Sequence, residues 1–88
     1  MTNSQHMPLV RILLFARAAE LCGARETLLE LPAPASVYDA WSHLQARSPE
    51  LAELKDATRV ARNGHLASFD DVLLDGDELA LLPPVGGG

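Results

Sequence analysis

The first apolar stretch of the chain has the length of a β-strand. Residues 9–15 are apolar on both faces except at Arg11, a pattern that predicts a central strand covered on both sides. Residues 16–21 favour helix, and Gly23 suits the left-handed conformation that closes a helical turn. We therefore expect a strand followed directly by a short helix.

Prolines mark the end of the next extended segment. Residues 25–31 alternate loosely between polar and apolar side chains before Pro32 and Pro34. Because proline lacks the backbone donor that a sheet ladder uses, these prolines end the segment. The pattern predicts a second strand that forms a hairpin with the first.

The middle of the chain carries the pattern of an amphipathic helix. Residues 36–39 have the form of a capping box in which aspartate replaces glutamate. Apolar residues follow at spacings of three, four and seven, as on one face of a helix: Val37, Ala40, Trp41 and Leu44. This main helix is expected to end before Pro49 and to bury Trp41 in the core. Residues 49–54 leave room for one further helical turn.

A tight reversal is expected at Asn63-Gly64. Both residue types tolerate positive φ, which short turns between paired strands require. Residues 58–61 and 66–68 flank this reversal. They are therefore predicted to pair as two short strands.

The last apolar segment is followed by two prolines. Residues 78–82 come after a turn signal at 75–77, and Pro83-Pro84 ends them. The most apolar strands are thus the first and the last, which favours a sheet in which they are central parallel neighbours. We predict an α+β fold of the β-grasp type. It has a mixed sheet of four to five strands packed on one main helix, plus short helices.

The chain length allows one domain. A chain of 88 residues leaves little interior for an enclosed substrate cavity, so any chemistry is expected at an edge or a terminus. We assign residues 9–82 to the β-grasp domain and residues 83–88 to an extended C-terminal tail. Residues 1–8 are expected to be disordered or left over from cloning, because His6-Met7 is also what a common cloning site leaves behind.

Charge and cysteine content exclude several classes of protein. The net charge of -5 disfavours nucleic-acid binding, which needs clustered lysine and arginine. A single cysteine, Cys22, allows no intramolecular disulfide and fits a reducing cytoplasm. The apolar runs are too short for a membrane span, and the N-terminal residues lack the pattern of a secretory signal. We expect a cytoplasmic protein that binds neither nucleic acid nor membrane.

The last six residues form a candidate reactive tail: Pro83, Pro84, Val85, Gly86, Gly87 and Gly88. The prolines restrict φ and aim the tail away from the sheet, and six extended residues reach about 20 Å. Glycines let such a tail enter a narrow pocket. The terminal carboxylate is ionised at neutral pH and is a poor electrophile, so it must be activated before it reacts. The alternative is a frayed end or an engineered linker.

The two ends of the domain resemble a known family. Residues 75–88, Asp-Gly-Asp-Glu-Leu-Ala-Leu-Leu-Pro-Pro-Val-Gly-Gly-Gly, resemble the end of the molybdopterin synthase small subunits, the MoaD-like proteins. Residues 9–23 resemble their opening strand and helix, and Asn63-Gly64 falls at a comparable reversal. The order of Gly-Asp-Glu, an apolar strand, Pro-Pro-Val and a terminal diglycine carries the resemblance, which spans residues 9–88.

The resemblance implies a sulfur carrier with a ubiquitin-like β-grasp fold. An ATP-dependent, MoeB-like adenylyltransferase would adenylate Gly88, and sulfur from a persulfide donor would replace AMP to give a thiocarboxylate. The loaded tail would enter the MoaE-like large subunit of molybdopterin synthase. There it would donate sulfur to cyclic pyranopterin monophosphate, a step of molybdenum cofactor biosynthesis. The chain would be an accessory subunit with no permanently bound cofactor and no catalytic side chain of its own.

The resemblance also implies docking residues. Phe15, Leu81 and Leu82, with the tail from Pro83, are expected on or near the surface that binds the large subunit. Core packing is the alternative for each of these three apolar residues. Gly86 stands where the family usually has a small non-glycine residue, which gives a looser tail at an entropic cost on insertion.

Several alternatives stay open. Cys22 is expected to be a buried structural thiol and not a nucleophile. His43 and His65 lack the spacing of metal ligands, so no metal site is expected. The chain could carry sulfur for thiamine, tRNA thiolation or cysteine synthesis instead. It could also be a protein modifier joined through Gly88 to lysines. Because Lys55 is its only lysine, chains of such a modifier could grow through one side chain only.

Overall fold

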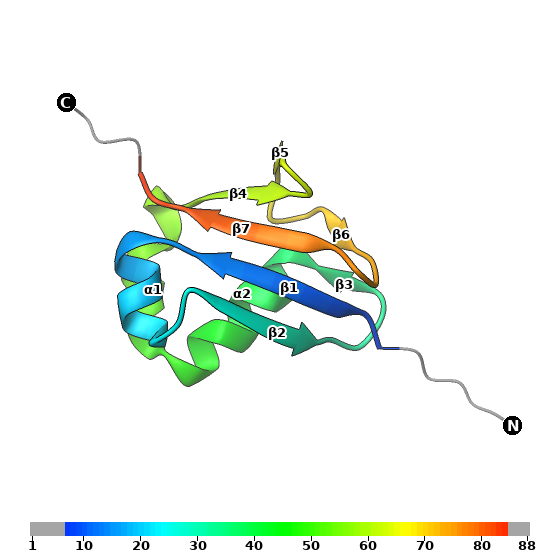
Figure 1. Cartoon of the computed structure of the whole chain (residues 1–88), viewed down its shortest axis with the longest axis horizontal. Coiled ribbons are helices and arrows are strands. Elements are labelled where there is room, and N and C mark those ends of the chain that lie inside the picture. Colours follow the sequence, from blue (N-terminus) through cyan, green and yellow to red (C-terminus); the bar gives the residue numbers. More distant parts are fainter. Residues whose placement is uncertain (1–6, 85–88) are drawn as a thin grey trace, which may run out of the picture.

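The computed structural model describes residues 7–84, drawn in colour in Figure 1. In chain order the elements are β1 (Leu9–Leu14), α1 (Ala16–Cys22), β2 (Glu26–Glu30), β3 (Ala35–Ser36), α2 (Val37–Arg47), the 3₁₀ helix η1 (Pro49–Ala57), β4 (Arg59–Arg62), β5 (His65–Ala67), β6 (Val72–Leu73) and β7 (Glu78–Leu82). Within residues 7–84, no helix is long and apolar enough to cross a membrane.

The first and last strands are parallel neighbours at the centre of the main sheet. Its five strands are ordered β2-β1-β7-β4-β5, and every pair except β1–β7 is antiparallel. A parallel pair needs a long crossover connection, and here that connection contains α2, the helix on which the sheet packs (Figure 1). This topology confirms the predicted α+β, β-grasp arrangement.

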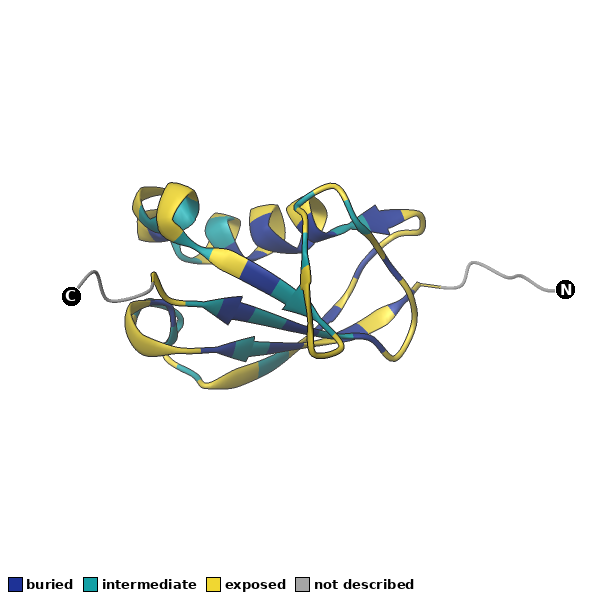
Figure 2. Ribbon diagram, turned by 90° about the horizontal axis from the view of Figure 1, so that it is seen from above, coloured by how far each residue is buried: buried dark blue, intermediate teal, exposed yellow. Residues whose placement is uncertain are grey.

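The sheet is covered by helices on one face only. Figure 2 shows a layer of helices along one side of the strands and an open opposite face. Along β1, Val10, Ile12 and Leu14 are buried, whereas Arg11 is exposed and Leu13 is half-buried. The prediction that this strand is covered on both sides is therefore wrong. Leu13 lies on the open face as part of an apolar surface. A continuous apolar run in the sequence does not distinguish such a strand from one that is covered on both faces.

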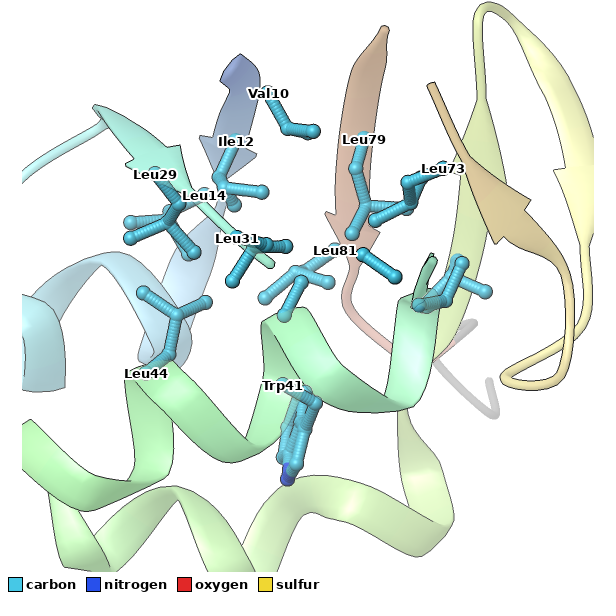
Figure 3. Packing of buried hydrophobic residues seen from close by; sticks show 14 of the residues in the cluster. Val10, Ile12, Leu14, Leu29, Leu31, Trp41, Leu44, Leu73, Leu79 and Leu81 are labelled. Atoms are coloured by element: carbon cyan, nitrogen blue, oxygen red, sulfur yellow. The ribbon is translucent and has the colours of Figure 1, made fainter. Parts of the chain in front are cut away.

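The core lies between the sheet and α2. Figure 3 shows Ile12, Leu79 and their neighbours between the strands and the helix, with Trp41 pointing from α2 away from the strands. Trp41 is 1% exposed, and its ring meets the ring of Phe69 edge to face with centroids 5.8 Å apart. Its indole N–H donates to Oε1 of Gln45 at 2.9 Å, so its one polar atom is satisfied. The prediction that Trp41 is a core residue is confirmed.

Ser36 begins α2 as its N-cap. Its Oγ accepts a hydrogen bond from the Asp39 backbone N–H at 3.1 Å, and the Asp39 carboxylate accepts one from the Ser36 N–H at 2.8 Å. Two donors that a helix start leaves unsatisfied are thus bonded. The predicted capping box is confirmed, as is the end of the helix before Pro49.

Gly23 ends α1 as predicted. Its φ of 71° lies in the left-handed region, and its N–H donates to the Ala19 carbonyl at 2.9 Å. Glycine adopts this conformation without the steric cost that a Cβ brings. The short helix between the first two strands therefore has a defined end.

Two short strands and most of η1 have no periodic signal in the sequence. β3 and β6 pair over two residues each, Ala35 opposite Leu73 and Ser36 opposite Val72. Strands this short leave no alternation to recognise. η1 extends to Ala57, beyond the single turn expected.

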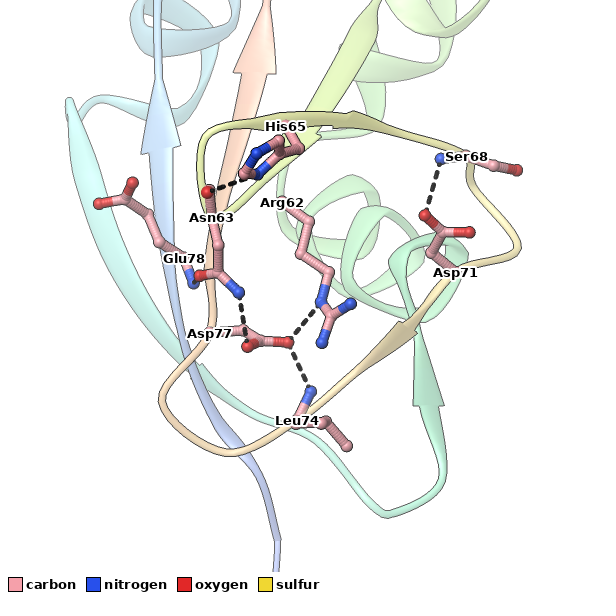
Figure 4. A network of polar contacts seen from close by, with 8 residues as sticks. All are labelled: Arg62, Asn63, His65, Ser68, Asp71, Leu74, Asp77 and Glu78. Atoms are coloured by element: carbon pink, nitrogen blue, oxygen red, sulfur yellow. Dashed lines mark hydrogen bonds and ion pairs between the residues drawn. The ribbon is translucent and has the colours of Figure 1, made fainter.

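A buried carboxylate joins the two turns that precede the last strand. Asp77, 7% exposed, accepts hydrogen bonds from Arg62 Nε at 2.7 Å and Asn63 Nδ2 at 2.9 Å (Figure 4). It also accepts from the Leu74 backbone N–H at 2.7 Å. Asn63 Oδ1 in turn accepts from the Glu78 N–H at 2.9 Å. The reversal between β4 and β5 is thereby fixed to the start of β7.

The ionised form of Asp77 is favoured in the folded protein. Burial raises the pKa of this carboxyl, but hydrogen bonds from Leu74, Asn63 and Arg62 and the charge of Arg62 outweigh burial, so the pKa lies below its usual range. A group with a depressed pKa in the folded state stabilises the fold above its unfolded pKa. That contribution is lost as the pH falls through the folded value.

We expect Asp77→Asn to lower the free energy of unfolding by about 1–3 kcal/mol at neutral pH, because charge-assisted acceptors are lost from a buried site. The difference from the wild type should shrink as the pH falls from about 5 to 2, where the wild type also loses the charge. Urea unfolding followed by the fluorescence of Trp41, the one tryptophan, measures both effects. Asp56→Asn, an exposed change on η1, is the control. A difference that does not vary with pH would contradict this role.

Candidate functional site

The parallel pair β1–β7 brings the predicted docking residues to one end of the sheet. The two strands run in the same direction, and Leu14 of β1 lies beside Leu81 of β7. Phe15 directly follows β1, and Leu82 and Pro83 continue the chain at the end of β7. Residues near the two ends of the sequence are thus neighbours in space.

An apolar groove of about 130 Å³ lies at this end of the sheet. Phe15 and Arg17 line it from the start of α1, Leu54 from η1, and Leu82 and Pro84 from the end of β7. Pockets that hold substrates or cofactors usually measure about 300–1,000 Å³, so this groove fits one apolar side chain. Among its described lining residues there is no carboxylate, imidazole or thiol. The groove is therefore suited to docking and lacks groups for acid–base catalysis.

A left-handed residue makes the turn from β1 into α1. Phe15 is extended, with φ -130° and ψ 155°, whereas Ala16 has φ 50°. This conformation costs a residue with a Cβ about 1–2 kcal/mol. The abrupt turn leaves the Phe15 side chain 43% exposed at the rim of the groove.

Alternation along β7 separates the two predicted docking leucines. Leu81 is 1% exposed and packs in the core, whereas Leu82 is half-buried on the opposite face. Leu81 also lines the groove from the core side, so its expected place on or near the docking surface stays a prediction. Phe15 and Leu82 do lie at the surface, and their docking role stays a prediction.

The root of the tail is exposed at the groove. Pro83 and Pro84 are exposed and line it directly after the central strand β7. The rest of the predicted tail lies outside the described residues: Val85, Gly86, Gly87 and Gly88. The role of Gly88 as the reactive terminus stays a prediction.

Leu66 is a docking candidate that no local sequence signal marks. At 70% exposed, it has the most accessible side chain of the large apolar residues in 7–84. In the sheet register Leu66 lies opposite Ala61, Ala61 opposite Ala80, and Ala80 beside Leu13. These four residues form an apolar row across the open face. Only the register of the predicted Asn63-Gly64 hairpin could have placed Leu66 there.

Charged side chains lie on both sides of the apolar row. On the side away from the groove, Arg11 pairs with Glu78 at 2.6 Å and with Glu26 at 3.6 Å. On the groove side, exposed Arg59 lies beside Leu82 in the sheet register. Exposed ion pairs add little to stability, but charges around an apolar surface affect which partner binds and how fast.

The remaining chemistry-bearing residues add no site. Cys22 is half-buried and packs against the core. Among residues 7–84, no three His, Cys, Asp or Glu side chains are grouped closely enough to hold a metal ion. The arrangement thus leaves an apolar surface beside the exposed Pro83 and Pro84.

The sequence also matches a known family along most of its length. Residues 12–88 match the ThiS family. The chain belongs to the ThiS family. The match runs from β1 through the C-terminal glycines, so it covers both the sheet and the tail.

Curated relatives of this ThiS-family chain carry two kinds of name. The chain is 40% identical over 83 residues to small archaeal modifier protein 1 of Haloferax volcanii, covering 85% of this chain and 95% of the relative. It is 39% identical over 82 residues to the molybdopterin synthase sulfur carrier subunit of Escherichia coli, covering 91% and 100%. The human protein of the same name is 32% identical over 82 residues, covering 90% and 93%.

Solved structures share the fold. The crystal structure of the Haloferax volcanii modifier superposes with a TM-score of 0.80 at 35% identity, covering 89% of this chain and 99% of that one. A chain from the Helicobacter pylori complex of subunits 1 and 2 of molybdopterin-converting factor gives a TM-score of 0.64 at 27% identity, covering 91% and 99%. The ThiS-family chain thus shares its β-grasp fold with the modifier and with a chain of the molybdopterin-converting factor complex.

We expect Leu81→Ala to lower the free energy of unfolding by about 2–5 kcal/mol, because it leaves a cavity in the core. Phe15→Ala removes a side chain from the surface and should cost less than about 1.5 kcal/mol. Urea unfolding of both variants measures the difference. Equal losses would contradict the placement of Leu81 in the core and Phe15 at the rim.

Proposed function

We propose that this chain is the sulfur-carrier small subunit of a molybdopterin synthase. The observation that carries the proposal is the position of the tail root, where the central strand β7 ends in exposed prolines beside an apolar groove and an open apolar face. The names of the Escherichia coli and human relatives support it. The chain then supplies a docking surface and a reactive terminus as an accessory subunit of a sulfurtransferase, and the large subunit supplies the catalytic side chains.

The proposed chemistry starts at the carboxylate of Gly88. In a MoeB-like adenylyltransferase this carboxylate attacks the α-phosphorus of ATP, and pyrophosphate leaves. The acyl-adenylate has the leaving group that an ionised carboxylate lacks. A persulfide donor then attacks the carbonyl carbon, AMP leaves, and cleavage of the sulfur–sulfur bond by a thiol yields the thiocarboxylate. ATP is used by the activating enzyme, and no cofactor stays on this chain.

The proposed partner of the loaded tail is a MoaE-like large subunit, where the sulfur passes to cyclic pyranopterin monophosphate. The similarity to a chain from a complex of subunits 1 and 2 of molybdopterin-converting factor supports a partner of this kind. Phe15, Leu82 and the apolar row form the proposed docking surface, because burying their exposed apolar area would stabilise the complex. We propose the cytoplasm as the compartment, where the thiols needed to cleave the sulfur–sulfur bond stay reduced.

A protein modifier is the second candidate. The 40% identity to small archaeal modifier protein 1 favours it. In that role the activated Gly88 would be joined to lysine amines of other proteins, and conjugates would appear on gels after lysis under denaturing conditions. Sulfur carriers for thiamine, tRNA thiolation or cysteine synthesis differ in another way, because they would show no affinity for a molybdopterin synthase large subunit.

Incubation with an activating enzyme, ATP and a persulfide donor should raise the intact mass by the difference between one sulfur and one oxygen, mapped to Gly88. Deletion of Gly88 should abolish sulfur transfer and leave folding and large-subunit binding nearly intact, because the last strand of the sheet already ends at Leu82. Sulfur transfer by the shortened chain would refute the mechanism. An unchanged mass, with the enzyme shown active on a known carrier, would make the chain a binding module.

Leu66→Ser should weaken binding to the large subunit about tenfold or more, because an exposed leucine buried on docking contributes about 1.5–3 kcal/mol. Val72→Ser is the matched control, since Val72 is 51% exposed but lies on β6, outside the main sheet. Calorimetric titration of each variant measures the affinity. Equal affinities for the two variants would rule out the apolar row as the docking surface.

A further inference from the structure

The one lysine of the chain lies over two aromatic rings. Nζ of Lys55 lies 4.6 Å from the ring centroid of Phe69 and 5.4 Å from that of Tyr38. Both distances are within the range of about 6 Å over which a cation is attracted to the face of a ring. The Lys55 side chain is half-buried there. We call these three residues the lysine clamp.

Backbone and ring contacts hold the lysine clamp in place. The Tyr38 N–H donates to the Phe69 carbonyl at 2.9 Å, so the two ring-bearing residues are tied together. The Phe69 ring also packs on Trp41 and against the core. Since Lys55 comes from η1 and Tyr38 from α2, the clamp joins three separate segments.

We propose that the lysine clamp protects Lys55 from acylation by activated carboxyl termini, so that the chain is a poor acceptor for its own activated Gly88. Acylation would join Nζ to the carbonyl carbon of an acyl-adenylate and break the bond to AMP. The ammonium loses one proton to become the nucleophilic amine and a second proton as the amide forms. The amide formed is uncharged, so both cation–π contacts are lost. The nitrogen must also leave the rings before it can meet a carbonyl carbon.

The consequence for the carrier rests on the proposed function. A terminus activated as an acyl-adenylate reacts with any accessible amine, and each such reaction would consume a carrier molecule. A chain whose single lysine is occupied by two rings removes its own lysine side chain as a competing acceptor. The same clamp limits side-chain-linked chain growth if the protein is a modifier.

Acetylation by a sulfo-N-hydroxysuccinimide ester tests the clamp without any partner protein. The rate at Lys55 is measured by mass spectrometry of peptides cut at acidic residues. The reference is the double variant Lys55→Arg/Arg47→Lys, which moves the single lysine to an exposed position at the end of α2. We expect Lys55 in the wild type to react about fivefold more slowly than the moved lysine. Equal rates would overturn the proposal.

Two substitutions of Tyr38 separate the ring from the bulk of the side chain. Tyr38→Phe keeps the ring face, whereas Tyr38→Leu removes it, and Tyr38 is 51% exposed, so neither change disturbs the core. We expect Tyr38→Leu to raise the acetylation rate at Lys55 about threefold and Tyr38→Phe to leave it within about twofold of the wild type. Thermal unfolding confirms that both variants fold. The same rate in both variants would overturn the role of the rings.

Addition of an activating enzyme and ATP extends the test to Gly88. With the wild type as substrate, the activating enzyme should exchange pyrophosphate into ATP, which reports adenylation of Gly88. The wild type should form few two-chain products linked at Lys55. Tyr38→Leu should form more of them. Absence of adenylation would overturn the proposed function, while the acetylation rates would still decide on the clamp. Two-chain products of the wild type as abundant as those of the moved-lysine variant would overturn the inference.

Discussion

The parallel pairing of β1 with β7 is the contact on which the rest of the structure depends. It joins the first strand to the last, so the sheet is complete only when the whole domain has come together. The inward residues of both strands supply the centre of the core, and α2 in the crossover covers them. Because the two strands point the same way, β7 can end only where α1 begins. The position of the tail root therefore follows from the topology.

The two ends of β7 are held by different means. At its start, the Asp77 carboxylate binds groups from both preceding turns, which sets the position of the strand along its neighbours. At its end, Pro83 has no backbone N–H to donate to a neighbouring strand, so the pairing of β7 ends at Leu82. A strand fixed at its start and released at its end gives the tail a fixed point of departure. The Asp77 network therefore helps to determine the position of the tail root, although the two lie at opposite ends of β7.

Local sequence signals were sufficient for most elements. Gly23, the Ser36 cap and the prolines each act over a few residues, and each ended or began an element as predicted. Local signals do not predict which face of the sheet a residue lies on, because β1 and β7 carry apolar residues on both faces. Leu81 and Leu82 are chemically identical, and only pairing with β4 and β1 separates core from surface. The groove likewise needs α1, η1 and β7 together, so no single stretch of sequence predicts it.

The fold and the overall sequence similarity do not separate a sulfur carrier from a protein modifier. The Haloferax volcanii modifier and the Escherichia coli sulfur carrier subunit are nearly equally similar to this chain, at 40% and 39% identity. Activation at a C-terminal glycine would serve either role, because both need a leaving group on the same carbonyl. The choice of acceptor then lies with the protein that meets the tail, and hence with the surface that selects that protein. Under the proposed function that surface is the open face of the sheet, where Leu66 and Arg59 are exposed.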